Sequence, residues 1–108
     1  MHLAIRRYEV DPASMDEIVR HLNEGFIPLI KDAQGFLAYY ALDTGEGVLA
    51  TVSAFEGREG AEESIRMASD YIREHLASLL PNPPQVTAGE VRAHELNLTK
   101  LGVREVKG

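Results

Sequence analysis

The sequence contains no cysteine and no tryptophan. Without cysteine the chain cannot form disulfides, thiolate metal sites or a cysteine nucleophile, which fits a reducing cytoplasm. It carries no basic stripe, and its formal net charge is −6, so we expect no nucleic-acid partner. No stretch approaches the roughly 18 apolar residues of a membrane span, and the N-terminus lacks the features of a signal peptide. These absences predict a soluble cytoplasmic protein without a membrane partner.

What is present is an ordinary globular composition. The chain has 108 residues, of which 44% are hydrophobic and 26% are charged. This length suits one hydrophobic core, and this composition is richer in apolar residues than that of disordered chains. We therefore expect a single folded domain over residues 1–95, followed by a C-terminal arm or tail over residues 96–108.

Apolar periodicity and breaker residues predict six elements. They are a strand at 3–10, a helix at 14–32, strands at 36–42 and 48–55, a helix at 58–80, and a strand at 86–94. Gly25 and Pro28 predict a bend in the first helix. The order βαββαβ with right-handed crossovers predicts an α+β, ferredoxin-like fold, a four-stranded antiparallel sheet with two helices on one face.

The alternation of residues along each strand suggests which side faces the helices. Apolar side chains are expected beneath the helices, and this set consists of Leu3, Ile5, Val48, Ala50, Val52, Val91 and Ala93. The opposite face would then hold a mixed set: Arg6, Tyr8, Leu37, Tyr39, Thr51, Ser53, Phe55, Glu90, Arg92 and His94. A face of that kind predicts a homodimer that encloses a partly polar cavity, since isologous dimers are the commonest soluble assemblies.

Four short segments resemble those of a known family. They are Glu24-Gly25-Phe26, Gly35-Phe36, Val52-Ser53-Ala54-Phe55-Glu56 and Ala88-Gly89-Glu90-Val91. With the order of elements across about residues 2–95, they make the chain similar to the antibiotic biosynthesis monooxygenase family of the dimeric α/β barrel superfamily. The resemblance implies a homodimer. It also implies, as the leading hypothesis, a cofactor-independent monooxygenase that acts on a small aromatic or quinol-type substrate.

Two other functions stay open. The chain could be a dimer that binds a small molecule or a partner without catalysis. The family also contains haem-degrading members that use an asparagine, a tryptophan and a histidine, and of these only His75 has a counterpart here, so haem binding through His75 is the third hypothesis. The four histidines show no short metal-ligand spacing, and we expect no metal and no cofactor.

In the monooxygenase hypothesis a base removes a phenolic proton and the substrate anion reacts with oxygen. His94 or His75 would be the base, and Arg92 or Arg6 would stabilise the anion. The expected substrate-binding residues are Arg6, Tyr8, Tyr39, Ser53 and Glu90. Each has a structural alternative: His75 as a boundary residue with one hydrogen bond, Arg6 and Glu90 as a cross-strand ion pair, and the tyrosines as packing residues with wet hydroxyls.

Overall fold

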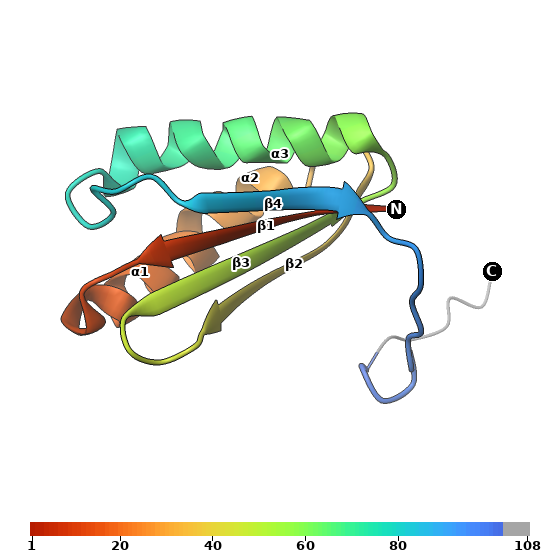
Figure 1. Cartoon of the computed structure of the whole chain (residues 1–108), viewed down its shortest axis with the longest axis horizontal. Helices are drawn as coiled ribbons and strands as arrows, with labels where there is room; N and C mark the ends of the chain where they lie inside the picture. The colour runs from red at the N-terminus through yellow and green to blue at the C-terminus, as the bar shows by residue number, and fades with distance from the viewer. Residues whose placement is uncertain (103–108) are drawn as a thin grey trace.

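The computed structural model describes residues 1–102 and consists of a four-stranded antiparallel sheet with the helices on one face (Figure 1). The elements are β1 (His2–Glu9), a 3-10 turn (Pro12–Ser14), α1 (Met15–His21), α2 (Ile27–Ile30), β2 (Phe36–Asp43), β3 (Val48–Phe55), α3 (Arg58–Tyr71) and β4 (Gln85–Glu90). The strands lie side by side in the order β2-β3-β1-β4. The predicted ferredoxin-like βαββαβ fold is confirmed.

The first helical segment is interrupted where the sequence predicted a bend. A π-helical turn over Leu22–Phe26 joins α1 to α2, and Gly25 lies within it. The hydroxyl of Tyr71 on α3 donates a hydrogen bond of 3.2 Å to the carbonyl of His21, and a Cβ at position 25 would lie 1.9 Å from that hydroxyl. A side chain at position 25 would have to displace the Tyr71 ring, so glycine permits this close approach of the two helical segments.

The second helical segment is shorter than predicted. Regular helix ends with α3 at Tyr71, and a π-helical turn over Ile72–Leu76 follows it. The chain then turns back through the proline-rich connector 77–84 to reach β4. Because proline lacks an N–H, this connector cannot continue the helix, and it closes one end of the space between α3 and the sheet.

The prediction of which sheet face lies beneath the helices was wrong. Arg6 and Tyr8 of β1 are buried on the helix side, with 1% and 4% of their surface exposed. The buried residues of β3 on that side are Leu49, Thr51, Ser53 and Phe55. Period-two alternation shows which residues share a face, but not which face the helices cover. The more apolar register lies on the far side of the sheet, and the arginine buried beneath the helices finds hydrogen-bond acceptors.

The face of the sheet away from the helices is mainly apolar. Val52 on β3 lies opposite Ile5 on β1 and Tyr40 on β2, and the side chain of Tyr40 is 57% exposed. Leu42 on the same face is 46% exposed. We call the set Leu3, Ile5, Tyr40, Leu42, Val48, Ala50 and Val52 the open face; the exposed charged residues Arg7 and Glu9 lie on the same side of the sheet at the end of β1. An apolar sheet face of this extent would be costly to leave in water.

After β4 the chain leaves the sheet in an extended path (Figure 1). Three leucines on this segment, Leu96, Leu98 and Leu101, are each more than half exposed. The last part of the predicted arm, 103–108, lies outside the described residues. None of the described helices is long and apolar enough to cross a membrane.

Candidate functional site

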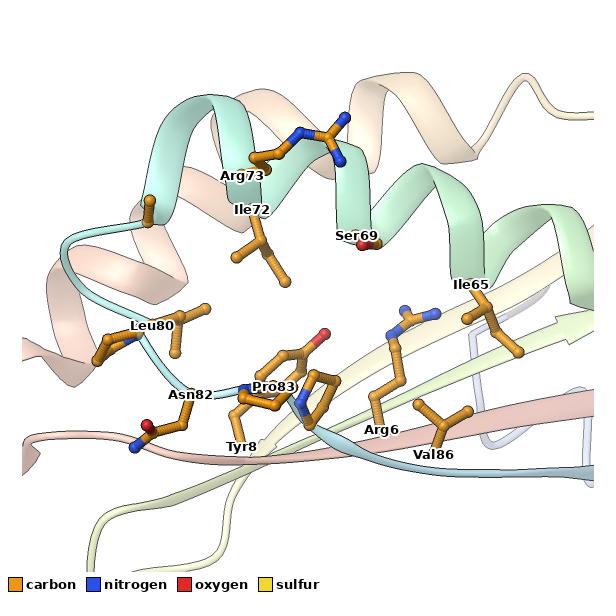
Figure 2. A pocket seen from close by; sticks show the side chains of 13 residues that line it. Arg6, Tyr8, Ile65, Ser69, Ile72, Arg73, Leu80, Asn82, Pro83 and Val86 are labelled. Carbon is orange, nitrogen blue, oxygen red and sulfur yellow. The ribbon is translucent and has the colours of Figure 1, made fainter.

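A cavity of about 500 Å³ lies between α3, β1, the start of β4 and the proline-rich connector (Figure 2). Arg6 and Tyr8 rise from β1 toward α3, while Ile65 and Ile72 point down from α3. Ser69 lies between those two isoleucines on the same side of the helix. The volume falls within the range of about 300–1,000 Å³ that is typical of sites for small molecules.

Arg6 forms the polar floor of this cavity. Its Nε donates to Thr51 Oγ1 at 3.2 Å, its Nη2 donates to Ser53 Oγ at 3.2 Å, and its Nη1 donates to the carbonyl of Ser64 at 3.4 Å. These bonds tie β1 to β3 and to α3. All three acceptors are uncharged, and within residues 1–102 no carboxylate lies within ion-pairing distance of Arg6.

Two tyrosines lie near Arg6. Tyr8 lines the large cavity, and both tyrosines line a separate small cavity of about 10 Å³ beside the π-helical turn. The ring of Tyr39 packs edge-on against Phe26, with ring centroids 5.5 Å apart. Burial raises the pKa of both tyrosines above 10.0, and the nearby positive charge of Arg6 opposes this shift only in part. Both hydroxyls are therefore protonated at neutral pH.

The structure brings four of the predicted site residues together. Arg6 and Tyr8 line the large cavity, both also line the small one with Tyr39, and Ser53 holds the guanidinium of Arg6. The large cavity, however, lies between the sheet and α3 of one chain and not on the open face.

The other predicted residues lie elsewhere. Glu90 pairs in register with His2, so the predicted cross-strand pair with Arg6 is wrong; Val86 lies opposite Arg6 instead. Arg92 and His94 are exposed on the segment after β4 and do not line the cavity.

His75, predicted at the core stripe of its helix, has a side chain that is 52% exposed. Its ring packs against that of Tyr71, with centroids 4.6 Å apart, and it does not line the cavity.

Sequence reasoning missed several residues of the site. Thr51 and Ser64 hold Arg6, while Ser69, Pro83 and Val86 line the cavity. A signal for part of this set was present, since residues 65, 69 and 72 follow the helical spacing of four and three. Among the described residues, no three His, Asp or Glu side chains lie close enough to hold a metal ion.

The raised pKa values predict a loss of stability in alkali. Well below pH 10.0 the two tyrosines are protonated in both the folded and the unfolded protein, so they add no pH dependence to the free energy of unfolding. Above that pH the unfolded chain releases these protons first, so the free energy of unfolding falls as pH rises through the raised values. Urea unfolding on both sides of pH 10.0 would measure the slope. A Tyr8→Phe, Tyr39→Phe double variant should have a shallower slope; an unchanged slope would contradict this assignment.

These features define a class of protein: a ferredoxin-like α+β domain with a cavity, sized for a small molecule, between its sheet and α3. No protein-family model matches the sequence, and no curated protein matches it.

Solved structures do match. A protein of unknown function from Nitrosomonas europaea shares 23% identity with a TM-score of 0.73, covering 89% of this chain and 93% of that one. A monooxygenase from Streptomyces coelicolor, solved with the ligand nanaomycin D, shares 24% identity with a TM-score of 0.72, covering 89% and 91%.

A protein from Bordetella bronchiseptica, described as an antibiotic biosynthesis monooxygenase, shares 18% identity with a TM-score of 0.69, and the match covers 85% of this chain and 97% of that one. The chain therefore has the fold of the antibiotic biosynthesis monooxygenases, as the sequence resemblance implied. Proteins of unknown function share this fold, so it does not by itself assign a reaction.

Proposed function

We propose that the chain is a cofactor-independent monooxygenase that oxidises a small aromatic or quinol-type molecule in the cavity beneath α3. The observation that carries the proposal is the cavity itself. About 500 Å³ of space is walled by isoleucines and prolines and floored by one buried arginine, a composition that suits a flat apolar molecule with a single polar group. The ligand-bound monooxygenase from Streptomyces coelicolor has the same fold and supports this choice.

The reaction would convert a phenol into a quinone. The phenolate form gives up electrons to dioxygen at a ring carbon. One oxygen atom becomes the new carbonyl oxygen on that carbon. The other leaves as water with the hydrogens of the phenol group and of the ring carbon, so atoms and electrons balance. Arg6 would stabilise the phenolate, and the apolar walls would exclude water from the reacting carbon.

A second function, binding without catalysis, is favoured by one observation. The residues that line the cavity include no histidine and no carboxylate, so none of them can accept a proton at neutral pH. A domain with this lining could hold an aromatic ligand and do nothing further to it. Haem binding gains no support, because His75 lies outside the cavity and is half exposed.

We also propose that two copies pair through the open face. Its exposed Tyr40 and Leu42 resemble the apolar centre of a subunit interface, and the leucines of the C-terminal segment could reach the partner. The sequence predicted this dimer, but from the opposite set of residues. Pairing through the open face leaves the cavity within each subunit, on the other side of the sheet.

Oxygen uptake with a panel of naphthols and hydroquinones whose ring substituents leave them ionised at neutral pH would test the reaction. We expect uptake that gives quinone and water, and we expect Arg6→Met to reduce kcat/KM by about tenfold or more because the phenolate loses its counter-ion. Arg20→Met is the matched control, since Arg20 is exposed on α1 and does not line the cavity. Ligand binding without uptake across the panel would favour the binding function, and uptake that Arg6→Met leaves unchanged would contradict the role of Arg6.

A further inference from the structure

We propose that the ligand of this cavity binds as an anion, a molecule already ionised at neutral pH through a carboxylate or an acidic phenol or enol, and that its negative charge pairs with Arg6. This inference rests on the proposed function for the location of the ligand. It goes further in specifying the ionisation state, which excludes neutral aromatics as preferred ligands.

Arg6 has no counter-ion among the described residues. Its cationic side chain is 1% exposed. Burying a lone positive charge is costly, and buried charges in proteins are normally paired. Within residues 1–102 the neighbours of Arg6 are hydroxyl groups and a backbone carbonyl, which solvate the guanidinium but do not neutralise it.

Arg6 can still offer hydrogen bonds to a charged ligand. A guanidinium has five N–H groups, and the three bonds to Thr51, Ser53 and Ser64 use three of them. The other two, one on each terminal nitrogen, have the neutral hydroxyls of Tyr8 and Tyr39 as hydrogen-bonding neighbours, and a ligand oxyanion would displace these hydroxyls. A carboxylate binds such a pair of N–H groups through both of its oxygens, a geometry in which each hydrogen bond is strengthened by charge.

The charge distribution around the cavity also favours an anionic ligand. The chain has 17 acidic and 11 basic side chains among Asp, Glu, Lys and Arg, yet the cavity lining includes two arginines and no acid. The second arginine, Arg73, points away from the cavity (Figure 2) and donates to Asp70 at 2.8 Å. Arg6 is therefore the unneutralised charge of the lining, and it makes the interior positive in an acidic protein.

The residues that line the cavity include no group that can act as a base at neutral pH. Tyr8 and Tyr39 are protonated at neutral pH, and no histidine or carboxylate lines the cavity. A phenol that needed help to lose its proton would find none there. A ligand that ionises in solution needs no base and brings the counter-ion that Arg6 lacks.

Two probes of nearly equal shape test the proposal: 2-naphthoate, which is an anion, and 2-naphthamide, which is neutral. Calorimetric titration of the intact wild-type protein should show that the naphthoate binds at least about tenfold more tightly, since a charge-assisted pair replaces a neutral contact. The wild-type comparison requires no substitution, so it does not depend on whether a variant folds.

Variants then locate the effect. Arg6→Met should abolish the preference for naphthoate, whereas Arg20→Met and Arg58→Met, at exposed positions outside the cavity lining, should keep it, and circular dichroism would verify that each variant is folded. Equal affinity of the two probes would overturn the anion proposal and leave an aromatic site in place. Binding of neither probe would overturn both the anion proposal and the proposed function. A preference that survives in folded Arg6→Met would remove Arg6 from the site.

Discussion

Val52→Glu is expected to convert a dimer into a monomer. Val52 lies at the centre of the open face, opposite Ile5 and Tyr40 on the neighbouring strands. In an isologous pair the substitution buries two carboxylates without partners, so we expect the dissociation constant of the dimer to rise by about 100-fold or more. Sedimentation velocity over a range of protein concentrations would measure the change.

The matched control for this prediction is Asn23→Glu. It adds the same charge at an exposed position of the first helical segment and should leave the assembly unchanged. The monomer formed by Val52→Glu should keep its fold, because the new side chain points away from the helices. A wild-type protein that is monomeric at micromolar concentration, or a Val52→Glu variant that remains dimeric, would contradict pairing through the open face.

Ser69→Trp is expected to prevent ligands from entering the cavity without unfolding the protein. Ser69 lies on α3 between Ile65 and Ile72, on the side that faces the cavity. An indole at this position would occupy space that the ligand needs, and the present side chain is exposed, so no packed contact is lost. We expect the affinity for 2-naphthoate to fall by more than about tenfold.

The control for this second prediction is Ser78→Trp. Ser78 is exposed and lies just beyond the second helical segment, where a tryptophan would not enter the large cavity. Its affinity for naphthoate should equal that of the wild type. Unchanged binding in a folded Ser69→Trp variant would show that the ligand lies elsewhere.

The fold could be predicted because local patterns and topological rules agreed. Proline at 12 and glycine at 57 mark the ends of strands, and right-handed crossovers place both helical segments on one face. The side of the sheet that faces the helices could not be predicted in the same way. Both faces carry apolar residues, because one meets the helices and the other is a candidate interface, so hydrophobicity alone could not distinguish them.

The candidate site could be predicted only in part, for a related reason. Arg6 and Tyr8 alternate on one strand and were correctly grouped together, since period-two spacing is independent of which face they occupy. Sequence reasoning treated a buried arginine as too costly, but Thr51, Ser53 and the Ser64 carbonyl supply its hydrogen bonds from 45 or more residues away. Contacts of that range carry no signal in a single sequence.

His75 and His94 show the opposite error. Strand alternation groups His94 with Arg92 and Glu90, and the helical stripe and the family resemblance single out His75, but both predictions depend on elements that are longer than the structure makes them. The structure leaves both outside the cavity. A residue whose type suits a reaction is therefore weak evidence for a site unless other site residues lie beside it. Arg6 is stronger evidence because it is buried at the cavity and held by Thr51, Ser53 and Ser64.

Locating a bound ligand tests most directly whether the site lies between α3 and the sheet. Isoleucine side chains lie on both sides of the sheet and can report which side the ligand contacts. In a protein with labelled isoleucine methyl groups titrated with 2-naphthoate, the NMR signals of Ile65 and Ile72 should move, while that of Ile5 on the open face should not. The largest shift at Ile5, with Ile65 and Ile72 unmoved, would contradict the account.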